Sequence, residues 1–406
     1  MDIKDLRSRI DSIKQQTNGS VHTGKSQREK KPRPDAGKTL LDNGWNRISE
    51  MVYEKVSVIN NILPEAVSDI LLDESCNTAE NKTMIPAENF VFYDTETTGL
   101  SAGAGNIVFL AGFGFLETSN DATTTGKTYL KIVQLFLSDF PGEPAFLERM
   151  KKYITPDRIY VSYNGKSFDA NILRSRYAMN AMQIDFGYQL DLLYSSRRLW
   201  KNIIGACSLG DIEREVLDKR RALDVPGFMV PDLYFDFIRT ARWDTIEGVN
   251  AHHLEDISSL AELLAVHEQL FAEAGEHILP GNYKPAEYID ALGLASLLAD
   301  KRPEKAALVL SSAFKGGNHK AGAGLSIIHK RAGRWDDAVI IWNRLWDDGK
   351  SIFAAVELAK YYEHRAHNIE KALGITNDVL GLERFRITGI KQELEKRKKR
   401  LITKLN

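Results

Sequence analysis

The feature that most constrains this chain is an apolar run that ends in closely spaced acids, NFVFYDTETTGL at residues 89–100. Its aromatic and β-branched residues at 90–93 predict a buried strand. Asp94 and Glu96 follow, and both carboxylates leave the strand on one face because residues i and i+2 point to the same side. Two buried like charges are costly unless a cation compensates them. The segment therefore predicts a site for a hard cation such as Mg²⁺ or Mn²⁺. The alternative is a surface turn with incidental acids, and the apolar run disfavours it.

Size and composition set broader bounds. A chain of 406 residues predicts two or three domains. Its formal net charge of −1 means that any nucleic-acid affinity has to come from local basic patches. The two cysteines, Cys76 and Cys207, lie far apart, which favours a reducing compartment and argues against a disulfide scaffold or a zinc site. The N-terminus lacks a secretory pattern, and the longest apolar run is far shorter than the ~20 residues of a membrane helix. We therefore expect a cytoplasmic protein that does not contact a membrane.

Residues 1–84 are predicted to form an N-terminal arm, basic and partly disordered. Within it we expect an amphipathic helix over 2–16, a basic linker over 17–38 and partly helical structure over 41–72. Residues 73–88 are polar and predict a loop that leads into the next domain.

Residues 85–280 predict an α/β domain. Runs at 90–95, 107–116 and 129–137, separated by Gly-, Ser- and Thr-rich segments, indicate an antiparallel meander. The helix and strand patterns that follow complete a mixed five-stranded sheet with flanking helices: a helix at 143–153, a strand at 158–163, a helix from about 167 and a strand at 188–192. Further helices are predicted at 192–200, 208–217, 231–240 and 245–274.

Residues 281–406 carry no strand signal and contain an internal repeat. The segment at 335–339 aligns with that at 369–373 at an offset of 34, so that Ala338 falls on Ala372. This is the period of tetratricopeptide units, and small residues at these places would let paired helices approach closely. We predict a helical-repeat domain that resembles tetratricopeptide units. The alternative is a plain helical bundle.

Two further acids fit the site begun by Asp94 and Glu96. Asp169 ends the segment VSYNGKSFD, just past the fourth strand, where the first turn of a helix favours a carboxylate. Asp256 lies in the helical segment NAHHLEDISSL, one turn after His252 on the same face and beside a buried stripe. Taken alone, Asp169 is also explained as a helix-start acid, and the histidines as structural residues.

Three motifs together resemble a known enzyme family. DTETTGL, NGKSFD and HHLED are similar to the first, second and third motifs of the DEDD exonucleases, the 3′-5′ branch of the ribonuclease H-like superfamily. The resemblance is closer still to YprB-type ribonuclease H-like proteins, and it covers roughly residues 85–385. Further similar segments lie at 190–193, 197–200, 208–209, 212–214, 224–227 and 231–235, and a helical-repeat tail is typical of that group.

The resemblance implies a ribonuclease H-like fold and phosphodiester hydrolysis with two Mg²⁺ or Mn²⁺ ions. Asp94 would bridge the ions, while Glu96, Asp169 and Asp256 complete their shells and His252 accepts the proton of the attacking water. The third motif departs from the family. His252 stands four residues before Asp256, which is the spacing of the family's tyrosine, whereas the family's histidine stands five before.

The expected substrate is single-stranded DNA or RNA, cleaved from its 3′ end. Thr97, Asn164, Lys166 and Arg198 are candidate substrate-binding residues, with Arg198 in a basic cluster next to Trp200. A solvated basic helix face explains that cluster equally well. The helical repeats suggest a protein partner. The alternative function is a weakly active or inactive nucleic-acid-binding adaptor, which the irregular third motif favours and the four acids disfavour.

Overall fold

The computed structural model describes residues 35–59, 64–99, 105–118, 128–221, 225–274, 289–382 and 388–406. The helix expected over 2–16 and nearly all of the linker expected over 17–38 lie outside these residues, as does the domain boundary predicted at 280–281. The described chain forms two compact units. Unit 1 holds the residues up to Arg197 together with Ala206–Gln269, and unit 2 holds Arg198–Gly205 together with the residues from Leu270 onward.

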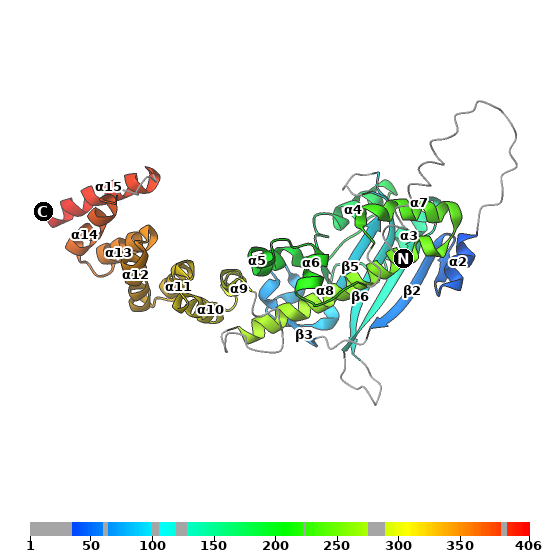
Figure 1. The fold of residues 1–406 in the computed structure, drawn as a ribbon, viewed down its shortest axis with the longest axis horizontal. Coiled ribbons are helices and arrows are strands. Elements are labelled where there is room, and N and C mark those ends of the chain that lie inside the picture. Colours follow the sequence, from blue (N-terminus) through cyan, green and yellow to red (C-terminus); the bar gives the residue numbers. More distant parts are fainter. Residues whose placement is uncertain are drawn as a thin grey trace, which may run out of the picture. The chain divides into compact units, whose positions relative to one another are not determined.

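A mixed seven-stranded sheet with flanking helices forms the body of unit 1 (Figure 1), and it confirms the α/β prediction. The strand order is β1-β2-β7-β6-β5-β8-β9, in which β5, β8 and β9 run parallel and the remaining neighbours are antiparallel. The strands are β1 (Asn46–Ser49), β2 (Val52–Ile59), β5 (Phe90–Thr97), β6 (Val108–Thr118), β7 (Thr128–Leu137), β8 (Ile159–Ser162) and β9 (Tyr188–Asp191).

Several segments of the predicted arm are strands. The partly helical structure expected over 41–72 is wrong at β1 and β2, which extend the sheet from five strands to seven. Strand β2 pairs with β7 along its whole length, and the alternation of polar and β-branched residues at 55–58 is the period-2 pattern of a strand. Residues 73–88 are not purely a loop, since β4 (Met84–Pro86) pairs with β3 (Ala66–Ser68) in a small second sheet.

The helices of unit 1 follow the sequence patterns closely. They are α2 (Ala36–Asp42), α3 (Glu143–Met150), α4 (Asp169–Met179), α5 (Leu192–Ile204), α6 (Leu209–Glu215), α7 (Val230–Thr240) and α8 (Glu247–Glu273), of which α5 and α8 run on into unit 2. The first of them begins inside the segment predicted as linker.

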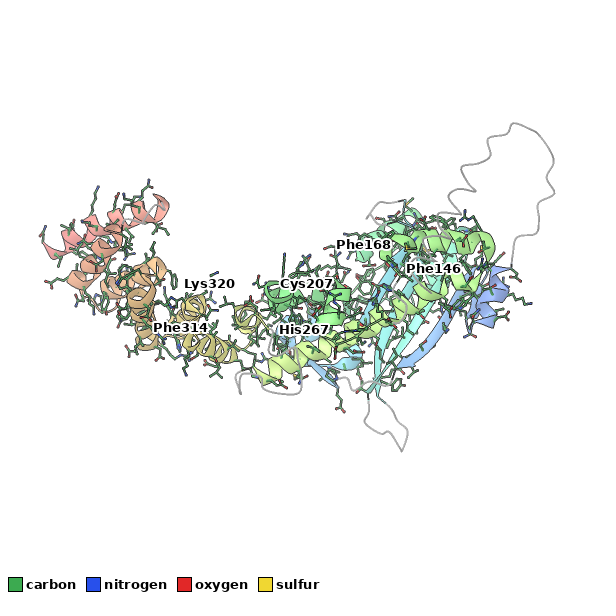
Figure 2. The ribbon with its side chains drawn as sticks, viewed as in Figure 1. Phe146, Phe168, Cys207, His267, Phe314 and Lys320 are labelled. Carbon is green, nitrogen blue, oxygen red and sulfur yellow. The ribbon has the colours of Figure 1, made fainter. Side chains whose placement is uncertain are left out.

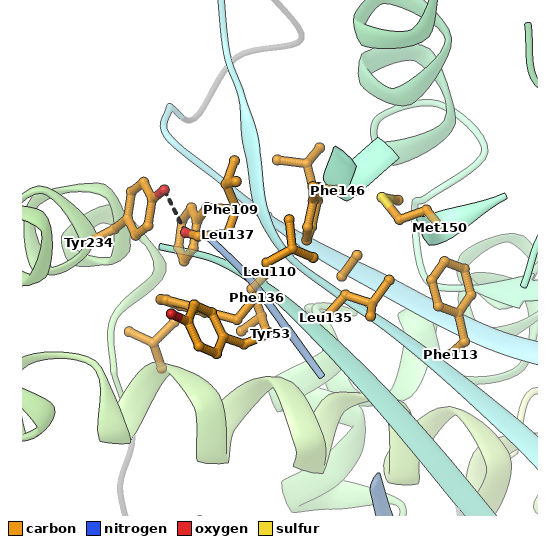
Figure 3. Packing of buried hydrophobic residues seen from close by; sticks show 14 of the residues in the cluster. Tyr53, Phe109, Leu110, Phe113, Leu135, Phe136, Leu137, Phe146, Met150 and Tyr234 are labelled. Carbon is orange, nitrogen blue, oxygen red and sulfur yellow. Dashed lines mark hydrogen bonds between the residues drawn. The ribbon is translucent and has the colours of Figure 1, made fainter. Parts of the chain in front are cut away.

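Aromatic packing ties the centre of the sheet to α7. The rings of Phe109 and Tyr234 stack with centroids 3.9 Å apart, and the Tyr234 hydroxyl donates a hydrogen bond of 2.8 Å to the carbonyl oxygen of Leu137 (Figure 3). Phe146 and Met150 of α3 are fully buried in the same core. These contacts fix β6 and β7 side by side, and β5 pairs with β6.

Two glycines on β6 let α8 lie directly on the strand. A Cβ at Gly112 would lie 2.1 Å from Cδ1 of Ile257 and 2.5 Å from Cε1 of His253, and a Cβ at Gly114 would lie 2.9 Å from Cγ2 of Ile257. Side chains alternate between the faces of a strand, so α8 covers the face opposite the side chains of Phe109 and Phe113. The third-motif helix is therefore held against the strand that neighbours β5.

Unit 2 is all helical in the residues described. Its helices are α9 (Ala291–Leu298), α10 (Pro303–Lys315), α11 (His319–Arg331), α12 (Trp335–Gly349), α13 (Ile352–His364), α14 (Ile369–Leu380) and α15 (Thr388–Leu405). Small residues lie where these helices meet: Ala338, Ala355, Ala359 and Ala372 are fully buried. Gly322 of α11 packs against the ring of Phe314 on α10; Phe314 is labelled in Figure 2. Descent from tetratricopeptide repeats stays a prediction.

An ionic cluster joins the last helices of unit 2. The buried carboxylate of Glu363 on α13 accepts hydrogen bonds from Arg397, Arg400 and Lys404 of α15, at 2.6 to 2.9 Å. The hydrogen bond from Arg400 is the main reason that the pKa of Glu363 is lowered to about 2. None of the described helices combines the length and apolar character that a membrane span requires.

Replacing Gly112 with alanine should weaken the contact between α8 and β6. The added methyl group would overlap the His253 ring, and overpacking of this kind typically costs about 1–3 kcal/mol. We expect a lower thermal midpoint for Gly112→Ala by scanning calorimetry.

Gly210→Ala is the matched control, because nothing lies within 4 Å of a Cβ at that position. Equal midpoints for Gly112→Ala and wild type would show that α8 does not rest on β6 in this way.

Candidate active site

Asp94 and Glu96 stand near the end of β5 and face α8. Asp94 is the register partner of Gly112 on β6, whose missing side chain would point at His253 and Ile257. Directly paired residues in a sheet project to the same face, so the Asp94 carboxylate points to the side that α8 covers. Glu96, two residues on, projects to that side as well. The pairing register shifts immediately after Glu96, where β5 leaves regular pairing.

Asp169 is the first residue of α4, and its carboxylate is buried. The hydroxyl of Thr95, between the two β5 acids, donates a short hydrogen bond to Asp169 Oδ1. The turn before α4 requires special backbone geometry, since Asn164 has a φ of 66° and a Cβ at Gly165 would lie 2.7 Å from Ser162 and 3.1 Å from Asp169 Oδ2. The turn of the second motif thus places Asp169 next to the first-motif strand β5.

Asp191 shapes this turn from the end of β9. Its Oδ1 accepts hydrogen bonds from the backbone N–H groups of Asn164, at 2.7 Å, and of Leu193, at 3.1 Å. Asp191 is a strand-end residue that holds the second motif in place.

Asp256 and His252 reach the site from α8. His252 Nε2 lies 3.3 Å from Asp256 Oδ2, the i, i+4 relation expected from the sequence. One ligand atom each from Glu96, His252 and Asp256 falls within 4.8 Å of the others, which is close enough for a single metal ion to bind all three. First-motif and third-motif residues therefore share one site.

His253 has a different environment from His252. Its ring is completely buried, with Nδ1 3.0 Å from the side-chain nitrogen of Gln134 and Nε2 3.1 Å from the carbonyl oxygen of Asp94. The amide N–H of Gln134 can only donate, so Nδ1 accepts and Nε2–H donates to Asp94. Burial lowers the pKa of His253 to about 4, and the ring is neutral near pH 7. It braces β5 against α8.

Arg221 is a component of the site that the sequence patterns did not reveal. Its guanidinium donates through Nη2 to Asp256 Oδ1, lies 2.7 Å from His252 Nε2 through Nη1, and donates through Nε to Glu213 Oε2 at 2.5 Å. The only signal was the basic run at 219–221, which resembles any solvated surface segment. It lies 31 residues before His252, and no local spacing connects the two.

Burial and mutual repulsion dominate the electrostatics. Burial, together with the charges of Asp169, Asp256 and Glu96, raises the pKa of Asp94 well above its usual range. Burial and the neighbouring Asp256 and Asp169 raise the pKa of Glu96 to about 8, and burial raises that of Asp169 to about 6. Arg221 opposes these shifts at Asp94 and Glu96. Crowded carboxylates with one imidazole form a donor set that fits Mg²⁺ or Mn²⁺.

The candidate substrate-binding residues are more scattered. The Thr97 hydroxyl is largely buried and donates to the carbonyl oxygen of Gly99 at 2.8 Å. Asn164 and Lys166 are exposed at the turn that precedes Asp169. Arg198 is exposed on α5 but belongs to unit 2. Substrate contact by these four residues stays a prediction.

Comparisons with known proteins place the chain in a family. The family model of the RNase_H superfamily matches residues 91–267. The uncharacterized protein YprB of Bacillus subtilis (strain 168) is 33% identical over 303 residues, which cover 72% of this chain and 69% of that protein.

Solved structures of exonuclease I show a weaker likeness. One structure of exonuclease I, described as suggesting how processivity is achieved, has a TM-score of 0.27 and 14% identity, and the match covers 45% of this chain and 40% of that one. The Escherichia coli enzyme in complex with a dA16 oligonucleotide has a TM-score of 0.23 and 16% identity, with 40% and 43% covered. The chain thus spans less than half of these proteins, and such TM-scores are below those of a shared overall fold.

The raised pKa of Glu96 predicts how the stability of the metal-free protein depends on pH. Between the ordinary glutamate value of 4.5 and about 8, the folded protein binds a proton that the unfolded chain has lost. The free energy of unfolding therefore falls as pH rises through this window and levels off above it. Glu96→Gln removes the titrating group, so from pH 6 to 8.5 in EDTA the wild-type midpoint should fall by roughly 4 °C more than that of the variant.

Glu117→Gln provides the control for a glutamate outside the site, since Glu117 lies on β6 in an exposed pair with Lys131. Parallel pH profiles for wild type and Glu96→Gln would contradict a Glu96 whose pKa is raised by desolvation and by its acidic neighbours.

Proposed function

The chain belongs to the YprB family of the RNase H superfamily, and on this premise we propose that it is a metal-dependent 3′-5′ exonuclease that hydrolyses single-stranded DNA or RNA. The proposal rests on one observation above all. Carboxylates from three separate elements, β5, α4 and α8, converge at one place and raise the pKa of one another. A protein gains nothing in stability from such crowding, whereas a cation-dependent reaction requires it.

In the proposed reaction, Asp94 and Glu96 of strand β5, together with Asp169 and Asp256, would hold two Mg²⁺ or Mn²⁺ ions. Bound divalent ions supply positive charge for the attacking and leaving oxygens of a phosphodiester. Thr95 keeps Asp169 oriented, and His253 keeps α8 at a fixed distance from β5 by its hydrogen bond to Asp94. Little rearrangement is then needed when the ions bind.

His252 is proposed as the group that accepts the proton of the attacking water. It is only partly buried, with 15% of its side chain exposed, whereas His253 is sealed and already uses both ring nitrogens. A histidine suits this transfer because its ordinary pKa lies near neutrality. The 3′-5′ direction rests on the similarity of the three motifs to those of DEDD exonucleases.

The two domains predicted from the sequence have different roles in this proposal. Residues 85–280 would carry out the hydrolysis, with Lys166 and Asn164 at the exposed turn next to Asp169 contacting the substrate backbone. The helical region over 281–406 would bind a protein partner.

Asp94→Asn should abolish hydrolysis and leave the fold intact. Asparagine keeps the shape but removes the charge that holds the cation, and losses of at least about 10²–10³ in rate are expected from removing a preorganised electrostatic group. The measurement is the digestion of 3′-labelled and 5′-labelled single-stranded DNA and RNA with Mg²⁺ or Mn²⁺. A 3′-5′ exonuclease releases labelled mononucleotide first from the 3′ label and produces a shortening ladder from the 5′ label.

Asp185→Asn is the matched control, because it removes the same charge from an exposed position outside the site. The proposed function fails if wild type digests none of the four substrates, or if Asp94→Asn retains the wild-type rate.

A further inference from the structure

Arg221 contacts Asp256 and His252, the two third-motif residues of the candidate metal group. Its Nη2 contacts Asp256 Oδ1, and its Nη1 lies 2.7 Å from His252 Nε2. A guanidinium can only donate, so Asp256 Oδ1 accepts from it, and Nη1 lies close to both ring nitrogens of His252. A metal ion held by Glu96, His252 and Asp256 would need lone pairs of the same two side chains. The guanidinium and the ion therefore compete for the same side chains, Asp256 and His252.

The guanidinium is held in place by a second carboxylate. Glu213 Oε2 accepts from Arg221 Nε at 2.5 Å, and the side chains of Glu213 and Arg221 are only 3% and 11% exposed. Glu213 belongs to α6 and lies outside the candidate metal group. This arrangement leaves Arg221 anchored when its contact with Asp256 is broken.

The segment that carries Arg221 is tied to α8 independently of the site. Lys219 Nζ lies 2.6 Å from Glu262 Oε1, and the Lys219 backbone N–H donates to the Glu213 carbonyl oxygen at 2.8 Å. Asp218, with a φ of 51°, turns the chain back toward α6. The structured segment at 218–221 thus positions Arg221 beside the acids.

The contact of Arg221 with Asp256 reduces the repulsion among the site's carboxylates. Asp94, Glu96, Asp169 and Asp256 repel one another, and the positive charge of Arg221 lowers the pKa of both Asp94 and Glu96. A guanidinium beside the cluster lowers the cost of keeping these acids together without a metal. It also lowers the site's affinity for cations, because the ion has to displace it.

We propose that Arg221 is an internal latch that neutralises the acid cluster in the metal-free protein and swings off Asp256 and His252 when a divalent ion binds. The same movement releases the His252 ring nitrogen. Metal occupancy and availability of the proposed base are thereby coupled. This latch rests on the proposed function for its consequence in catalysis, but its effect on metal binding does not require hydrolysis.

Calorimetric titration of the full chain with Mn²⁺ tests the latch. Arg221→Gln should bind Mn²⁺ about tenfold more tightly than wild type, as expected for removing a close competing charge. Arg221→Lys keeps the positive charge but loses the paired N–H groups of the guanidinium, and its Mn²⁺ affinity should lie between those of wild type and Arg221→Gln. The metal-free thermal midpoint of Arg221→Gln should drop, and saturating Mn²⁺ should restore more of it than in wild type.

Lys219→Gln is the matched control, since it removes one positive charge from the same segment but contacts Glu262 and Ser259 rather than the site. The double variant Arg221→Gln with Glu213→Gln avoids leaving Glu213 buried without its partner, and it should also bind Mn²⁺ more tightly. Equal or weaker Mn²⁺ affinity in Arg221→Gln and in the folded double variant overturns the latch. If Arg221→Gln binds Mn²⁺ more tightly but the wild-type protein digests neither labelled DNA nor labelled RNA, the latch is supported and the proposed exonuclease function is wrong.

Discussion

Repulsion between buried carboxylates is the constraint on which the arrangement of unit 1 depends. Asp94 and Glu96 stand two residues apart on a rigid strand, and Asp169 and Asp256 come from helices that pack at its end. Burial alone pushes the pKa values of these acids upward, and their proximity adds to the shift. Such a cluster persists only because the rest of the domain holds it together.

The supporting interactions are local and specific. Glycines on β6 let α8 approach, the buried His253 links α8 to the backbone of Asp94, and Thr95 links Asp169 to β5. The Phe109–Tyr234 stack and its neighbours keep the central strands in register on the opposite face. Arg221 then supplies the positive charge that the cluster lacks in the absence of metal. The fold and the candidate site are thus stabilised by the same few contacts.

Many of the strands, helices and site residues of unit 1 are predictable from the sequence, because they depend on patterns among residues close together in the chain. The apolar run before Asp94, the i, i+4 pair of His252 and Asp256, and the periodic helices α5 to α8 all depend on neighbours in the chain. Strand β2 was missed because its alternation at 55–58 is short and its partner strand β7 lies far along the chain. Arg221 was missed because a contact between residues 31 apart has no local signature.

The most direct test of a cation site built on these acids is the anomalous scattering of Mn²⁺ in crystals of the full chain. Density among Asp94, Glu96, Asp169 and Asp256, with the Arg221 guanidinium moved off Asp256, is the predicted result. Mn²⁺ bound elsewhere, or no bound Mn²⁺ at saturating concentration with Arg221 still paired to Asp256, would contradict the account.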